Sequence, residues 1–70
     1  MNSTVVLARF ENADDGVEGF VVLSSDGKKA HAGLRDLDSG NIVGGIRKYD
    51  LGDLEVAKAY AARLAAGKAS

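Results

Sequence analysis

Ser24, His31 and Asp36 carry the hydroxyl, imidazole and carboxylate groups that a nucleophilic triad combines. Their surroundings do not support that chemistry. No nucleophile elbow or comparable local pattern surrounds Ser24. His31 stands in a strand-like run, where a histidine is more often an ordinary strand residue than a general base. We therefore expect no catalytic residue in this group.

Carboxylates and glycines elsewhere in the chain partly match the motifs of paired-carboxylate catalysis, a calcium loop and a phosphate-binding loop, but none of these motifs is complete. Asp36 and Asp38 would share a strand face, but they lead into a turn, as many acidic residues do. The segment 36–41 (DLDSGN) lacks the later glutamate of a calcium loop, and 40–45 (GNIVGG) does not run into a helix as a phosphate-binding loop does. One histidine and no cysteine also leave too few ligands for a structural zinc site. We predict a protein that is not an enzyme and needs no metal or cofactor.

Charged side chains are the more informative chemistry, and they form two groups. The segment 11–19 (ENADDGVEG) is acidic, and it is either a solvated surface loop or an epitope that docks on a basic partner. Arginines of later strand-like runs are expected to form a basic sheet face. The candidate partner-binding residues are Asp14, Asp15 and Glu18 from the first group and Arg35 and Arg47 from the second.

The chain as a whole is small and nearly neutral. Nine Lys and Arg against ten Asp and Glu leave a net charge of −1, which argues against a nucleic-acid binder driven by one large phosphate-neutralising patch. We expect a single domain, residues 1–70, and a domain of this size buries only about 60–65% of its unfolded surface. No cysteine is available for a disulfide. No apolar run is long enough to span a bilayer and no secretory signal opens the chain, so we expect a cytoplasmic protein without membrane contact.

Four runs predict strands, and the first of them is rich in β-branched residues. They lie at residues 4–10, 19–24, 29–37 and 41–48. Asp26-Gly27 is a strong signal for a tight hairpin turn, and the sequence DSGN at 38–41 marks another turn. Gly44 and Gly45 weaken the last strand and are expected to allow a bulge or a close approach of the helix.

Residues 50–67 predict one helix. Asp50 is expected to cap its first turn and Gly67 to end it. Apolar residues recur at spacings of three and four, which predicts one narrow buried stripe. The stripe consists of Leu54, Ala57, Ala61 and Leu64. Its small alanines indicate that the helix lies close against a sheet.

These elements predict an α+β fold, an antiparallel four-stranded meander sheet with one C-terminal helix packed on one face (ββββα). Alternation assigns one set of side chains to the helix side: Phe10, Phe20, Val22, Ala30, Leu34, Ile42 and Ile46. The open face is expected to carry Val5, Leu7, Val21, Leu23 and Val43 beside Arg9, His31, Arg35 and Arg47. An uncovered, partly apolar sheet face is typical of a surface that binds a partner or forms a homodimer.

From Gly19 onward the chain resembles the small phage-encoded anti-CRISPR proteins that inhibit type I surveillance complexes. The matching features are Asp26-Gly27 with Lys29, Gly40 at the end of the third strand, Val43-Gly44 and Arg47 in the fourth, Asp50, and Leu54-Glu55 in the helix. The similarity covers about two-thirds of the chain. Ser24 and Arg35 stand where that family would carry aromatic or acidic contacts, so individual contact residues are not transferred.

The resemblance implies a stoichiometric inhibitor in the cytoplasm of the bacterial host. It would bind a protein subunit of the surveillance complex and block target DNA binding. In this hypothesis the acidic loop imitates phosphates on the lysine-rich DNA path, or the arginine face meets acidic protein or guide RNA.

An arm-type, integrase-like DNA-binding module is the alternative. Such domains resemble a three-stranded sheet followed by a helix of the kind expected at 53–64 (DLEVAKAYAARL), and their open sheet face enters a DNA groove. Arg9, Arg35 and Arg47 would be the contacts. The net negative charge disfavours direct nucleic-acid binding. A homodimer is compatible with either function.

Overall fold

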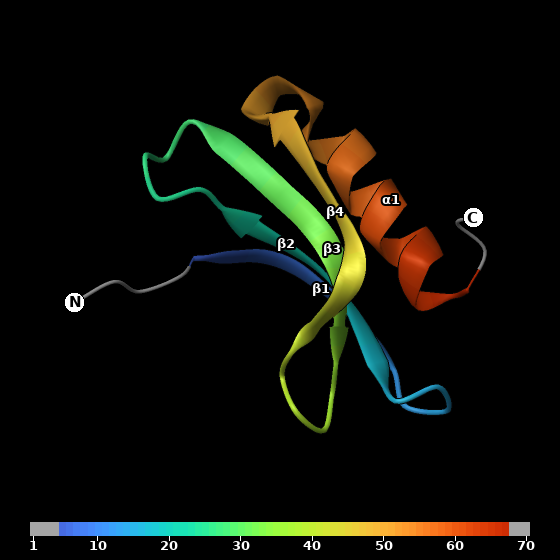
Figure 1. The fold of residues 1–70 in the computed structure, drawn as a ribbon. Helices are drawn as coiled ribbons and strands as arrows, with labels where there is room; N and C mark the ends of the chain where they lie inside the picture. The colour runs from blue at the N-terminus through green and yellow to red at the C-terminus, as the bar shows by residue number, and fades with distance from the viewer. Residues whose placement is uncertain (1–4, 68–70) are drawn as a thin grey trace.

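The structure, a computed structural model that describes residues 5–67, contains four antiparallel strands in the order β1-β2-β3-β4 followed by one helix (Figure 1). This confirms the predicted ββββα meander. The elements are β1 (Val6–Asn12), β2 (Val17–Leu23), β3 (Lys29–Asp36), β4 (Ile42–Asp50), a 3-10 turn η1 (Leu51–Asp53) and α1 (Leu54–Ala65). The first connection is shorter than predicted, because β1 continues to Asn12 and β2 begins at Val17. Residue 4, the predicted start of the first strand, lies outside the described residues.

The hairpin between β2 and β3 forms at the predicted Asp26-Gly27 turn. Gly27 has a φ of 73°, a conformation that glycine adopts without steric cost. The carbonyl of Ser24 accepts the Gly27 N–H at 2.9 Å, and the Asp26 carboxylate accepts the Lys28 N–H at 2.9 Å. The local sequence therefore closes this turn with its own side chains.

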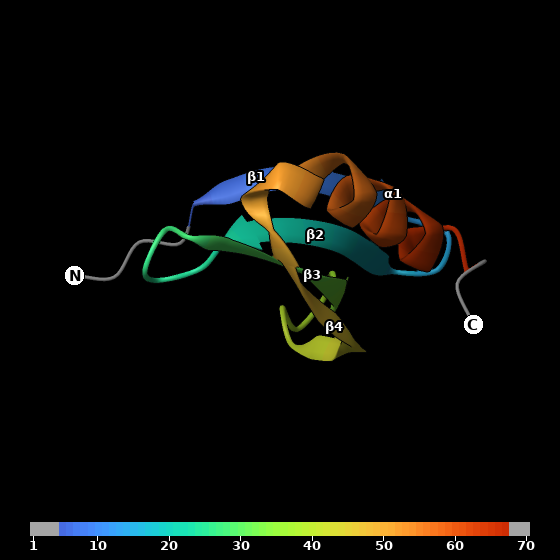
Figure 2. The same cartoon turned by 90° about the horizontal axis from the view of Figure 1, so that it is seen from above.

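Helix α1 covers one side of the sheet and leaves the other side open (Figure 2). The fully buried residues Val21, Ala30 and Ala32 of the sheet face Ala57 and Ala61 of the helix. Gly19 permits this contact, since a Cβ atom there would collide with the carbonyl group of Ala61. Small residues on both elements thus bring the helix backbone close to β2, as its alanine stripe predicted.

The strand pairing corrects the predicted faces. Phe10 pairs with Gly19, so Phe10 shares the helix side with Gly19 and Val21, and the alternate residues of β2 point to the open face. The prediction was therefore wrong for Phe20, Val22, Ile42 and Ile46, which lie on the open face. It was also wrong for Val21, Leu23 and Arg47, which lie on the helix side, and for Leu7, which packs against the core. Arg9, His31 and Arg35 lie on the open face as predicted.

Strand β4 is irregular at its two glycines. Its register against β3 shifts on both sides of Leu34, which confirms the predicted bulge. At Gly45 the strand also approaches the helix, because the Tyr60 hydroxyl donates a hydrogen bond of 2.6 Å to the Gly45 carbonyl. The bulge therefore ties this edge strand to α1.

Of the two predicted helix ends, the N-terminal cap is wrong and the C-terminal end is confirmed. Asp50 makes no side-chain cap, so that prediction was wrong; its carboxylate pairs with the Lys29 ammonium across the β3–β4 ladder. Gly67 has a φ of 74° and donates its N–H to the Leu64 carbonyl at 3.0 Å, which confirms it as the residue that ends the helix. Within residues 5–67, neither the length nor the hydropathy of any helix is sufficient to cross a membrane.

Candidate protein-binding surfaces

The residues considered for nucleophilic catalysis do not meet in the structure. Ser24 lies at the first end of β3, where its hydroxyl accepts the Lys29 N–H at 3.0 Å. Asp36 lies at the opposite end, about 20 Å away along an eight-residue strand. Its carboxylate accepts the Asp38 N–H at 2.9 Å, as in an ordinary turn. In residues 5–67, no three His, Asp or Glu side chains are grouped so that they could hold a metal ion.

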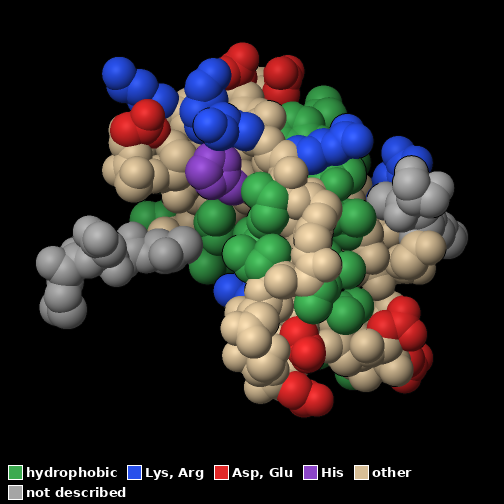
Figure 3. Space-filling model, viewed as in Figure 1, with side chains coloured by type: hydrophobic (Ala, Val, Ile, Leu, Met, Phe, Trp, Pro, Cys, Tyr) green, Lys and Arg blue, Asp and Glu red, His purple; other side chains and the backbone are tan. Residues whose placement is uncertain are grey.

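Carboxylates gather instead at one end of the sheet. The β1–β2 and β3–β4 turns lie side by side there, since the Leu37 N–H donates to the Gly16 carbonyl at 2.9 Å. We call this the acidic end, and it consists of Asp14, Asp15, Asp36 and Asp38. Neither of these turns contains a lysine or arginine. In Figure 3 carboxylates (red) lie along the lower edge of the molecule, and others lie at its top.

The C-terminal end of α1 lies beside the acidic end. The Asn12 side chain donates a hydrogen bond of 2.7 Å to the Ala65 carbonyl and another of 3.1 Å to the Asp15 carboxylate. The last carbonyl groups of a helix carry a partial negative charge. The helix terminus therefore adds to the negative potential of the neighbouring turn.

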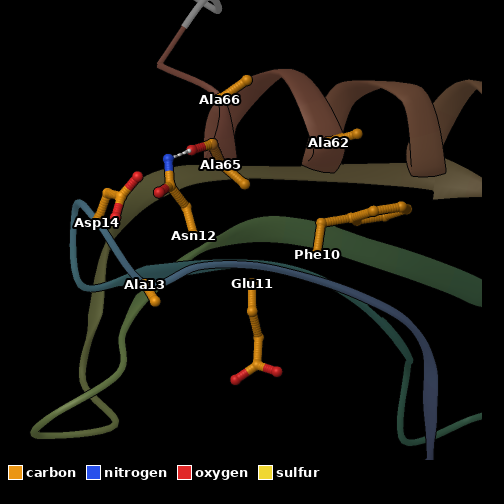
Figure 4. Close-up of a pocket in the computed structure, with 8 residues that line it drawn as sticks. All are labelled: Phe10, Glu11, Asn12, Ala13, Asp14, Ala62, Ala65 and Ala66. Atoms are coloured by element: carbon orange, nitrogen blue, oxygen red, sulfur yellow. Dashed lines mark hydrogen bonds between the residues drawn. The ribbon is translucent and has the colours of Figure 1, made fainter.

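A shallow groove of about 470 Å³ runs between the end of β1 and this helix terminus. Phe10 and Asn12 point toward the helix, whereas Glu11 points to the opposite side of the sheet (Figure 4). The groove has apolar walls at Phe10, Ala62 and Ala65 and is also lined by Asp14. Long basic side chains have an apolar stem and a cationic head, and a groove of this composition suits both parts.

Glu18 is separate from the acidic end although it belongs to the same acidic stretch of sequence. Its side chain is only 3% exposed on the open face and pairs with Arg9 and with Arg35, whose Nη2 lies 2.9 Å from Oε2. Burial by itself raises the pKa of Glu18, but the hydrogen bonds from Arg9 and Arg35 outweigh burial, so the net pKa lies below its ordinary value. Glu18 is therefore an ionised internal counterion.

The two predicted arginines lie on opposite sides of the sheet. Arg35 is on the open face, where its guanidinium carbon lies 5.1 Å from the centre of the Phe20 ring. Arg47 is on the helix side, 4.9 Å from the centre of the Tyr60 ring. Both stack on aromatic rings, an arrangement that stabilises a cation. Arg35 and Arg47 consequently do not form one basic face.

The structure thus brings Asp14 and Asp15 together with a second acidic turn that the prediction did not include. In a meander the first and third turns fall at the same end of the sheet, and this rule would have placed Asp36 and Asp38 beside Asp14 and Asp15. Comparisons of the chain with models of protein families, with curated proteins and with solved structures found no match. A proposal for its function therefore depends on these surfaces.

Proposed function

We propose that the protein is a stoichiometric inhibitor that binds a basic, nucleic-acid-binding protein through its acidic end. The observation that carries this proposal is the contact between the two turns, which places Asp14 and Asp15 at the same end of the sheet as Asp36 and Asp38, and neither turn contains a lysine or arginine. The proposed partner is a protein subunit of a type I CRISPR surveillance complex in the cytoplasm of a bacterial host. The protein would act as an anti-CRISPR that blocks target DNA binding.

The acidic end suits a lysine-rich path that normally holds a phosphate backbone. Carboxylates spaced over two turns present several negative charges, and such a surface accelerates association with a basic partner and suppresses association with acidic ones. The groove beside the helix terminus gives one lysine or arginine of the partner an apolar wall for its stem. The protein would therefore compete with DNA for the same cations.

The anti-CRISPR resemblance contributes the identity of the partner. Its matching residues lie in the β2–β3 hairpin, in β4 and in the first turn of α1, which together form one half of the fold. Gly40, a further matching residue, lies in the β3–β4 turn of the acidic end, and the other matching residues lie outside it. The resemblance therefore supports the choice of partner, and the geometry of the acidic end supports the choice of contact surface.

A gel-shift assay with a purified, guide-loaded type I complex and its target DNA tests the proposal. The unmodified protein is expected to remove the band of the complex with DNA at about one equivalent. The double variant Asp14→Lys/Asp15→Lys is expected to need at least roughly tenfold more protein, because several charge contacts of up to about 1 kcal/mol each are reversed.

Asp53→Lys/Glu55→Lys is the matched control, since it makes the same change of charge at exposed positions near the start of α1. This control variant is expected to inhibit as well as the unmodified protein does. Equal inhibition by all three proteins would contradict the role of the acidic end. A DNA band that survives a large excess of the unmodified protein would contradict the inhibition of target binding itself.

The integrase-like DNA-binding alternative receives less support from the geometry. Of its three proposed contacts, Arg9 and Arg35 already hold Glu18, and Arg47 lies on the other side of the sheet. A lane of the same gel with naked DNA and no complex tests it directly. A shift of naked DNA would replace the inhibitor proposal with this one.

A further inference from the structure

The open face carries exposed aliphatic side chains. Val6, Ile42 and Ile46 are 45%, 57% and 48% exposed, and half-buried Val22 pairs with Val6 in the neighbouring strand. We call these four residues the open-face patch. Figure 3 shows apolar side chains (green) below the single histidine (purple) and Lys and Arg side chains (blue) above it. Val6 and Val22 lie in β1 and β2, and Ile42 and Ile46 lie in β4 at the other edge of the sheet. Exposed apolar side chains distributed over an open sheet face mark an interaction surface.

We propose that the open-face patch binds a second copy of the same chain, face to face. The molecule is a thin slab of 33 × 28 × 15 Å, so its broad face can supply the roughly 800 Å² per partner that a standard interface buries. The charged cluster on this face is balanced, since Arg9 and Arg35 lie with Glu11 and Glu18. Two such faces can therefore meet without a net repulsion at their centre.

The remaining charges select one orientation of the two copies. Lys48 lies on the open face beside His31 at one end of the sheet, and the β3–β4 turn with Asp38 lies at the other end. In one orientation the two-fold axis lies in the plane between the two sheets and runs perpendicular to the strands. This axis reverses the strand direction of the second copy and stacks β4 on the partner's β4. Each Lys48 then faces the partner's β3–β4 turn with its carboxylates. A two-fold axis parallel to the strands would instead place the ends of like charge together.

Such a dimer is an isologous interface in which each Lys48–Asp38 contact occurs twice. Its strands cross at the small angle that is usual for two sheets packed face to face. This inference goes beyond the proposed inhibition, because it concerns the protein without any partner. Of the acidic end, Asp38 belongs to this interface, whereas Asp14, Asp15 and the groove beside the helix terminus lie outside it.

Sedimentation equilibrium of the full chain over a wide range of concentrations tests the proposal. The unmodified protein is expected to approach twice the chain mass of 7.3 kDa as its concentration rises. Ile42→Glu is expected to weaken this association by roughly tenfold or more, because it buries a charge in the apolar patch. Val56→Glu is the matched control, since Val56 is 56% exposed but lies on α1, and it is expected to leave the association unchanged.

A charge exchange tests the orientation. Lys48→Glu and Asp38→Lys are each expected to weaken the dimer by about two- to fivefold, and the double variant is expected to restore it because both contacts return with reversed sign. A circular dichroism melt of each variant shows whether it is folded. An unmodified protein that stays monomeric at every concentration, or equal association by Ile42→Glu and Val56→Glu, would overturn the proposal. A double variant no tighter than the single variants would overturn the orientation.

Discussion

At the scale of the residue, Glu18 is the side chain whose role depends most on its neighbours. It is buried in a strand that begins at Val17, and its two oxygens are shared between Arg9 and Arg35. A carboxylate without these partners would be costly at such a position, because burial favours the neutral acid. The arginines keep it ionised, and Phe20 beneath Arg35 holds one of them in place.

We expect Glu18→Gln to lower the free energy of unfolding by about 1–3 kcal/mol at pH 7, since it removes charged hydrogen bonds from a buried position. The folded state lowers the pKa of Glu18, so its stabilising contribution is complete above its unfolded pKa of about 4.3. That contribution is lost as the pH falls through the still lower pKa of the folded state. Urea unfolding of both proteins between pH 7 and pH 2 measures the difference.

The other carboxylates titrate in both proteins, so the difference between the two unfolding curves isolates Glu18. It is expected to be constant from pH 7 to about pH 5 and then to shrink. A difference that stays constant down to pH 2 would show that Glu18 is not held ionised by the arginines.

At the scale of the element, the contact between α1 and β2 depends on small residues on both sides. Ala57, Ala61 and Ala65 form the buried face of the helix, and at Gly19 no space is left between the strand and the Ala61 carbonyl for a Cβ atom. Interiors are packed so densely that an added methyl group must displace its surroundings. The helix therefore could not keep its place over a larger residue at position 19.

Gly19→Ala is expected to destabilise the protein by about 1–3 kcal/mol, because its Cβ atom would meet the Ala61 carbonyl. Gly52→Ala is the matched substitution, since a Cβ atom there meets nothing within 4 Å. It is expected to be neutral or to stabilise by up to about 1 kcal/mol through the unfolded state. Thermal melts of the two variants provide the comparison, and equal melting temperatures would refute the close contact at Gly19.

At the scale of the whole molecule, one helix covers one side of a four-stranded sheet in a chain of 70 residues. The core is correspondingly small, and its buried residues are mostly alanines with Val21 and Phe20. A domain of this size has little stability to spare. Burial of the open-face patch against a second copy would add to it.

The melting temperature of the unmodified protein is therefore expected to rise by about 3–5 °C for each tenfold increase in concentration, because dissociation accompanies unfolding. Ile42→Glu is expected to melt at a temperature independent of concentration. Differential scanning calorimetry over two decades of concentration makes this measurement. A melting temperature independent of concentration in both proteins would argue against a dimer that contributes to stability.

The sequence by itself determined which elements form and in what order. β-Branched runs, the Asp26-Gly27 turn, the alanine stripe and Gly67 are local signals, and each acts through residues that are neighbours in the chain. It also placed Asp14 and Asp15 in an exposed connection. The ββββα order followed from these signals because a meander needs only short connections.

Only the tertiary structure decided which faces these elements present. Alternation tells which residues of one strand share a face, but it does not tell which face the helix covers. Gly19 has no side chain to mark its side of β2, and Phe20 of β2 and Ile46 and Arg47 of β4 were therefore assigned to the wrong side. The pairing between strands likewise buried Glu18 between two arginines and joined Asp36 and Asp38 to the acidic end. These arrangements depend on contacts between distant parts of the chain, which no local pattern specifies.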